Sequence, residues 1–196
     1  MARYSNEIHK LLVSVSPHYY ILNNGQLKYQ KKKIETGLDD IGQSPKNHVV
    51  HYLLIDEYSG AFYAEVYPSR NMIPVEQFLY RAWAKKADHF FCGLPEINLI
   101  PKTIKPIVTA QLGPLFDTFG ITPMHPSSGF DAGSRVIRTW ENEITNFCFY
   151  PKPSFFRELQ LRAIKICEEA NNSLDKTVEW KRNLRKLILP LDHFYR

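Results

Sequence analysis

The hydrophobic positions of this chain show a strand-like pattern in two places. From His48 to Asp56 the residues are almost continuously β-prone, and a Tyr-Ser-Gly turn leads into a second such run from Ala61 to Tyr67. The runs Tyr19–Leu22 and Gln26–Tyr29 flank an Asn-Asn-Gly turn. Because Asn-Gly or Ser-Gly between two β-prone runs is a strong local hairpin signal, both pairs are predicted to form β-hairpins.

Other segments carry apolar residues at the spacing of an amphipathic helix. They are Tyr4–Val15, a helix that begins at Pro74, an irregular helix over Thr103–Gly120, Ser134–Phe149, and two C-terminal helices over Ser154–Ala170 and Leu174–Leu189. Short strands are expected at Ile97–Ile100 and Ile121–Thr122, the first of them parallel because a helical crossover leads into it. The stretch Gln30–Asn47 is expected to be a connection with at most a short strand around Leu38–Ile41. The β-β-α-β order predicts a mixed α/β sheet flanked by helices.

Composition narrows the class of protein. The chain has 196 residues, 44% hydrophobic and 23% charged, which fits one self-sufficient core and argues against disorder. Three scattered cysteines without a CxxC pair, no signal-peptide pattern and no long apolar run lead us to expect a cytoplasmic protein with no membrane contact. Zinc-ligand spacings, a nucleophile elbow, a Walker loop and a dinucleotide fingerprint are missing from the sequence, which argues against conventional hydrolase and nucleotide-binding sites.

The formal net charge of +5 is concentrated in two clusters. One comprises Lys28, Lys31, Lys32 and Lys33, and the other comprises Lys176, Lys181, Arg182, Arg185 and Lys186. Such clusters either bind phosphates or are simply solvated faces, and both interpretations stay open. Tyr29 and Trp180 are candidates for stacking on unpaired bases, although Trp180 also fits an apolar face that docks the last helix on the domain.

The order of motifs after residue 37 resembles that of integrase and transposase catalytic cores. HYLLIDEYSGAFYAEVY is similar to their second and third strands, and GLPEINLIPKT to their Gly-x-Pro turn and fourth strand. A helix ending in Phe-Gly-Ile follows, and HPSSGFDAGSRVIRTWE resembles the Pro-rich loop and the helix that carries the last catalytic carboxylate. The resemblance covers residues 38–148. It implies a ribonuclease-H-like fold and DNA strand transfer by two divalent metal ions held by three carboxylates.

The sequence departs from that carboxylate set. Asp40, or its neighbour Asp39, is the only acid available for the first position, and this pair fits a turn as well as a ligand. Pro101-Lys102 stands where the second acid is expected, and Arg135-Val136 where the third is expected. Because cations at these places repel a divalent metal, we expect two-metal catalysis to be lost.

A different register would retain a metal site. Asp56 would then supply the first carboxylate, with Glu141 or Glu143 approaching it from the following helix, whereas the plainer interpretation makes Asp56 a turn residue. The catalytic candidates, if the protein is active, are Asp40, Asp56 and Glu141. Magnesium or manganese is expected only in that case, and otherwise no cofactor.

The sequence therefore predicts an N-terminal helix and β-hairpin extension over residues 1–37, a ribonuclease-H-like core over residues 38–150, and a C-terminal helical hairpin over residues 151–196. The predicted function is that of a protein of mobile-element origin that binds DNA, or a transposase partner, without strand transfer. An active nuclease or strand transferase with relocated carboxylates, and a structural or assembly subunit such as a homodimer, remain alternatives. The expected nucleic-acid contacts are Lys31, Lys32, Lys33, Lys102, Arg135, Lys181, Arg182 and Arg185.

Overall fold

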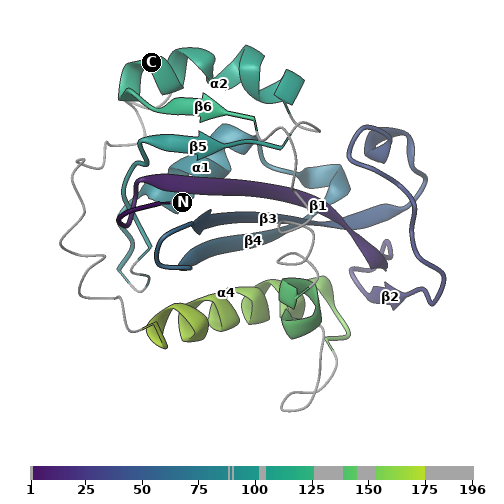
Figure 1. The fold of residues 1–196 in the computed structure, drawn as a ribbon. Coiled ribbons are helices and arrows are strands. Elements are labelled where there is room, and N and C mark those ends of the chain that lie inside the picture. The colour runs from purple at the N-terminus through teal and green to yellow at the C-terminus, as the bar shows by residue number, and fades with distance from the viewer. Residues whose placement is uncertain are drawn as a thin grey trace.

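The computed structural model describes residues 2–87, 89, 91–101, 105–125, 139–144 and 153–174. Within them a six-stranded mixed sheet forms the centre of the molecule (Figure 1). Its strands are β1 (Ile8–Ile21), β2 (Leu27–Tyr29), β3 (Asn47–Asp56), β4 (Phe62–Pro68), β5 (Ile97–Leu99) and β6 (Thr122–Met124).

The strand order is that of a ribonuclease-H-like sheet. The main path runs β4-β3-β1-β5-β6, and β2 pairs with the end of β1. Neighbours are antiparallel from β4 to β1 and parallel from β1 to β6. Counting only the strands of the main path along the chain, the order reads 3-2-1-4-5, which is typical of the ribonuclease-H-like fold.

The first strand, β1, lies at the centre of the sheet, so the prediction of an N-terminal helix over Tyr4–Val15 is wrong. Leu11 packs into one hydrophobic core and Leu12 into the other, on opposite faces of the sheet. A strand buried on both faces carries a continuous apolar run, which fits helical spacing equally well. The expected boundary between residues 37 and 38 therefore separates β1 and β2 from a sheet to which both belong.

Both predicted hairpins are confirmed. β1 and β2 pair from Tyr19 opposite Tyr29 onward, and β3 and β4 pair along the length of β4. Their turns contain Gly25 at φ 81° and Gly60 at φ 77°. Glycine adopts positive φ without the steric cost that a Cβ imposes, which explains why these local turn signals were reliable.

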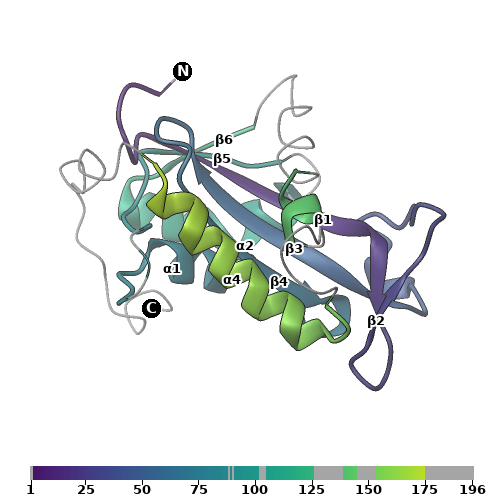
Figure 2. The same ribbon diagram turned by 90° about the horizontal axis from the view of Figure 1, so that it is seen from below.

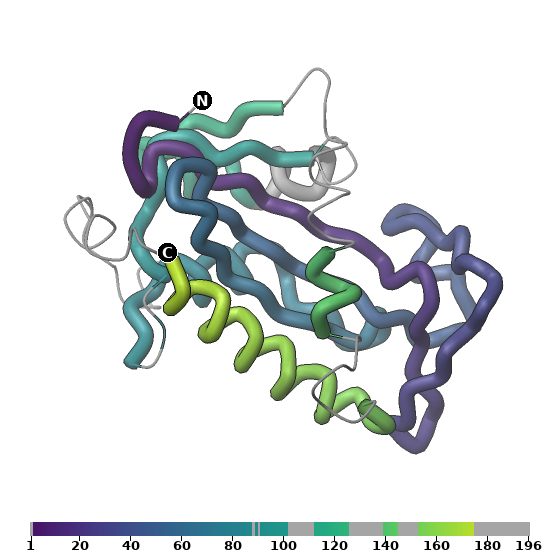
Figure 3. Tube along the Cα trace, turned by 60° about the horizontal axis from the view of Figure 1, so that its bottom comes forward, coloured from purple at the N-terminus to yellow at the C-terminus, as the bar shows by residue number. Residues whose placement is uncertain are grey.

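Helices cover both faces of the sheet. α1 (Val75–Trp83) and α2 (Lys105–Phe119) pack on one face. α4 (Phe156–Asn172) crosses the other face, as Figure 2 shows, and the helical residues 139–144 lie on the same side (Figure 3). The helices predicted from Pro74, over Thr103–Gly120 and over Ser154–Ala170 are thereby confirmed. No helix in the described part of the chain is long and apolar enough to cross a membrane.

The shorter predictions have mixed outcomes. The parallel strand at Ile97–Ile100 is confirmed as β5, and Ile121–Thr122 leads into β6. The stretch Gln30–Asn47 connects β2 to β3 as expected, and it contains the 3-10 helix η1 (Ile41–Gln43) rather than a short strand around Leu38–Ile41. A second 3-10 helix, η2, spans Ser69–Asn71. The helix predicted over Leu174–Leu189 lies outside the described residues after Leu174, and so does most of Ser134–Phe149.

Candidate functional site

The three carboxylates expected in an active enzyme lie in three different places. Asp40 is exposed and precedes η1, in the connection between β2 and β3. Asp56 ends β3 and is completely buried. Glu141 belongs to the helical residues 139–144 on the α4 face. Among the described residues no group of three or more histidines, cysteines or acids is arranged to hold a metal ion.

Asp56 joins the β3–β4 turn to the segment that enters β1. Its Oδ2 accepts hydrogen bonds from the backbone N–H of Ser59 at 2.7 Å and from the Ser59 hydroxyl at 2.6 Å, and its Oδ1 accepts one from the backbone N–H of Asn6 at 2.8 Å. Burial raises the pKa of Asp56, and these hydrogen bonds lower it in part. Such contacts are typical of an acid that organises a turn.

His9 lies beside Asp56 and is fully buried. Its Nδ1 accepts a hydrogen bond from the Trp83 indole N–H at 3.2 Å, and its Nε2 lies 2.9 Å from Oδ1 of Asn6 and 3.9 Å from Oδ1 of Asp56. Because Trp83 occupies the lone pair of Nδ1, these partners assign the single ring proton to Nε2. Burial lowers the pKa of His9 to about 3, so the ring is neutral at pH 7.

Glu141 faces the middle of the sheet. Its carboxylate accepts a hydrogen bond from the hydroxyl of Ser16 on β1, and its Oε1 lies 3.7 Å from Nε2 of His51 on β3. All three side chains are buried. The helical residues 139–144 therefore present a carboxylate to β1, whereas the alternative register expected Glu141 to approach Asp56. The neighbours of Glu141 there are a hydroxyl and an imidazole rather than other carboxylates.

The assignment of the first acid also needs correction. The strand beside β3 in the sheet is β1, not a strand at residues 38–41, so Asp40 does not lie on it. β1 contains no aspartate or glutamate, and the parallel strand β5 is followed by Ile100-Pro101-Lys102. Magnesium and manganese require several hard oxygen ligands. The central strands and the described residues around them therefore do not fit the metal pair that the resemblance implies.

A Cys–His–Asn group connects α4 to β4. Nε2 of His89 lies 3.3 Å from Sγ of Cys167 and 3.3 Å from Nδ2 of Asn171. Such a trio serves cysteine nucleophiles elsewhere, but only when the thiol ionises. Here burial raises the pKa of Cys167 to about 12 and lowers that of His89 to about 4. The thiol keeps its proton and donates it to the carbonyl oxygen of Phe62 at 3.1 Å, so the group fastens the helix to the strand.

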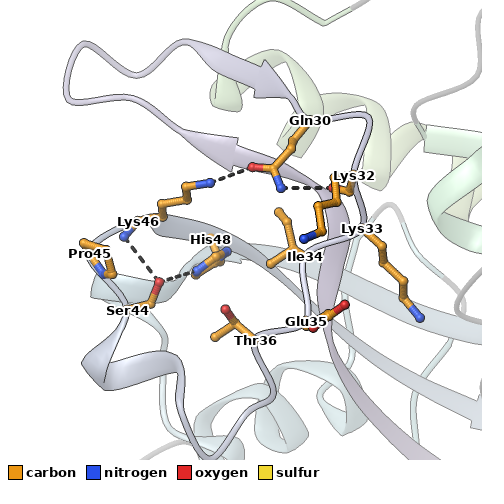
Figure 4. Close-up of a pocket in the computed structure, with 10 residues that line it drawn as sticks. All are labelled: Gln30, Lys32, Lys33, Ile34, Glu35, Thr36, Ser44, Pro45, Lys46 and His48. Atoms are coloured by element: carbon orange, nitrogen blue, oxygen red, sulfur yellow. Dashed lines mark hydrogen bonds between the residues drawn. The ribbon is translucent and has the colours of Figure 1, made fainter.

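The predicted lysine cluster borders a cleft. Figure 4 shows this cleft, of about 280 Å³, between the connection that follows β2 and the beginning of β3. Three lysines line it against a single carboxylate, that of Glu35. Its polar lining comprises Gln30, Lys32, Lys33, Glu35, Thr36, Ser44, Lys46 and His48. Of the other predicted contacts, Lys31 is exposed beside the cleft, while Lys102, Arg135, Lys181, Arg182 and Arg185 lie outside the described residues.

Two groups of contacts shape the cleft walls. The ammonium of Lys46 donates to Oε1 of Gln30 at 2.6 Å and lies 4.6 Å from the ring centre of Tyr20. The hydroxyl of Ser44 lies 2.6 Å from Nε2 of His48 and accepts a bond from the backbone N–H of Lys46. Burial, and secondarily the charge of Lys46, lower the pKa of His48. The cleft thus combines ammonium groups, a hydroxyl and a neutral imidazole.

A β-bulge in β1 brings the two walls together. The register between β1 and β3 shifts between Val15 and Tyr20. There the carbonyl oxygen of Pro17 accepts a bond from the backbone N–H of Ile34 at 2.7 Å, and the carbonyl of His18 accepts one from Gln30 at 2.8 Å. Bulges redirect a strand locally and free its backbone for other partners. Sequence reasoning found the lysine run but missed Ser44, Lys46 and His48, whose only local signal is a polar stretch before a strand.

Comparisons with known proteins agree with the fold. No protein-family model matches the chain, and no curated protein matches it. Among solved structures, the HTLV-2 integrase catalytic core domain in complex with magnesium (trimeric form) is similar, with a TM-score of 0.46 and 12% sequence identity over 86% of each chain. The expected likeness to the retroviral integrase core is thus a structural similarity without a match to a sequence family.

Proposed function

We propose that this protein binds nucleic acid through a ribonuclease-H-like domain that does not cut or join strands. The observation that carries the proposal is the chemistry of the central strand β1. It contains no carboxylate, and the buried acids Glu141 and Asp56 beside it have other partners. Glu141 is bonded to Ser16 and lies beside His51, whereas Asp56 accepts hydrogen bonds from Ser59 and Asn6. A two-metal site requires several carboxylates in one place, so the fold retains its shape without the ligands for that chemistry.

The binding half of the proposal rests on charge. The net charge is +5, and the run Lys31–Lys33 is exposed at the edge of the cleft. Exposed lysines neutralise phosphates and release condensed counterions, which makes binding strong at low salt and independent of sequence. We propose DNA as the partner, in a cytoplasmic protein of mobile-element origin, with a transposase as a further partner.

Salt-dependent binding tests the proposal. Fluorescence anisotropy with labelled single- and double-stranded DNA should show log-linear weakening with salt. About three phosphate contacts would reduce duplex affinity about 40-fold between roughly 50 and 200 mM salt. Replacing Lys31, Lys32 and Lys33 by glutamine should reduce the slope by two to three units, or about one for each lysine. The matched control replaces Lys10, Lys85 and Lys165 by glutamine. It has the same net charge as the first triple variant but should change the slope little.

Metal titration tests the absence of catalysis. Calorimetry with magnesium and manganese should detect no saturable site, and labelled DNA should stay intact with either ion. Metal-dependent cleavage that Glu141→Gln abolishes would overturn this half of the proposal and support the nuclease alternative. Salt-independent anisotropy, with no difference between the two triple variants, would overturn the binding half. A stable oligomer in the absence of DNA would then favour the assembly alternative.

A further inference from the structure

We propose that the cleft beside the β1 bulge is a binding site for a phosphoryl group, and that a strand of nucleic acid enters it through one backbone phosphate. This deepens the proposed function and rests on it for the identity of the molecule that carries the phosphate. The cleft's polar lining supplies donors of the kind that an oxyanion requires: lysine ammonium groups and the hydroxyls of Thr36 and Ser44.

The size of the cleft indicates a small group. At about 280 Å³ it lies just below the range of roughly 300–1,000 Å³ found for sites that enclose whole drug-sized ligands. A phosphoryl group fits with room for water. The lining offers mostly charged and polar side chains, with Ile34 and Pro45 as its apolar members, so it suits a phosphate better than a base.

The lysines are arranged to serve such a group. Lys46 uses one of its ammonium hydrogens on Gln30, which holds the side chain along the wall and leaves two donors for a ligand. In Figure 4 the ammonium of Lys32 lies toward the interior of the cleft, whereas Lys33 extends away from it. Lys32 and Lys46 come from opposite walls, so an anion between them would be contacted from both sides.

Ser44 completes the donor set, with His48 as its hydrogen-bond partner. Because Nε2 of His48 lies 2.6 Å from the Ser44 hydroxyl, one tautomer donates from Nε2 and leaves the hydroxyl hydrogen available to an anion. A bound phosphate would also offset the positive charge of Lys46, which contributes to lowering the pKa of His48. Occupation of the cleft should therefore raise the pKa of His48.

An exposed aromatic ring next to the cleft points to nucleic acid. Tyr29 ends β2 immediately before Gln30, is 49% exposed, and packs against the rings of His18 and Tyr19 at centroid distances of 5.6 Å and 5.4 Å. Its neighbours hold the ring in place while half of it faces solvent. Base stacking on such a ring is tolerant of sequence, so a strand anchored by its phosphate would find a platform beside the cleft.

The experiment combines two ligands with matched variants of the full chain. Inorganic phosphate and a short single-stranded oligonucleotide are titrated separately, and NMR follows the ring resonances of His48 and the backbone amides of Ser44 and Lys46. We expect both ligands to shift these signals. Lys32→Gln and Lys46→Gln should each weaken both ligands about tenfold, which is the size of a lost charge-assisted hydrogen bond. Lys46→Arg should retain binding, and Lys165→Gln on α4 is the control that should have no effect.

Tyr29→Leu separates the two ligands. It should weaken the oligonucleotide but leave inorganic phosphate unchanged, because only a base can stack on the ring. If DNA binds with unchanged affinity in Lys46→Gln and the His48 signals do not move, the cleft is not the site and the inference fails, while the proposed function stands. If phosphate binds in the cleft but no DNA binds, the phosphoryl site stands and the proposed function fails. If neither ligand binds, both are overturned.

Discussion

Replacing Asp56 by asparagine tests whether this residue stabilises the β3–β4 turn or takes part in catalysis. The carboxylate of Asp56 accepts three hydrogen bonds, two from Ser59 and one from Asn6, and it is completely buried. Asparagine has one side-chain oxygen, which can accept either the hydrogen bond from Asn6 or those from Ser59. Its NH₂ group then faces the remaining donors and cannot accept from them. The substitution therefore tests whether the role of Asp56 lies in these contacts.

The expected cost follows from those bonds. A hydrogen bond to a charged group contributes about 1.5–3 kcal/mol, and Asp56→Asn loses at least one and leaves a buried donor without a partner. Burial raises the pKa of Asp56 because it disfavours the charged carboxylate, so removing the charge offsets part of this loss. We expect a net loss of about 2–4 kcal/mol of the free energy of unfolding. For a chain of this size that corresponds to a fall of about 5–15 °C in Tm.

Urea unfolding followed by circular dichroism measures this loss, with Glu57→Gln as the matched control on the same turn. Glu57 forms a surface ion pair with Lys10 at 3.0 Å, so its substitution should cost less than about 1 kcal/mol. DNA binding by folded Asp56→Asn should equal that of the unchanged protein. The reasoning is refuted if Asp56→Asn is as stable as Glu57→Gln, or if it eliminates a metal-dependent cleavage activity without loss of stability.

Two further predictions concern buried titratable groups. The pKa of His9 is lowered to about 3, so the folded state binds fewer protons than the unfolded state below the ordinary histidine pKa of 6.5. Stability should therefore fall as pH drops from about 6.5 toward 3, with His9 contributing about 1.4 kcal/mol per pH unit, and NMR should find the His9 ring neutral at pH 5. A charged ring at that pH would contradict the Trp83 hydrogen bond. Cys167, with its pKa raised to about 12, should react with iodoacetamide at least tenfold more slowly in the folded chain than in urea, as peptide mapping by mass spectrometry would show. Equal rates would mean that the contact with His89 activates the thiol.

Local signals in the sequence determined the hairpins and most of the helices. Asn24-Gly25 and Ser59-Gly60 are typical turn sequences. Both glycines adopt a positive φ, which few other residues tolerate. The order of these elements also predicted a ribonuclease-H-like sheet, and the observed strand order 3-2-1-4-5 agrees with that prediction. The absence of acids after β5 was visible in the same way, because it depends only on which residues follow a recognisable strand.

Tertiary structure alone decided the role of β1. Its apolar positions satisfy a helix and a doubly buried strand equally well, and pairing with β3 and β5, which are distant in the sequence, selects the strand. That pairing also determines that Glu141 meets Ser16 rather than Asp56. The cleft is likewise a product of the bulge in β1, which brings Lys32 opposite Lys46. Sequence fixes which side chains are available, whereas contacts between distant segments depend on burial and hydrogen bonding that exist only once the sheet has formed.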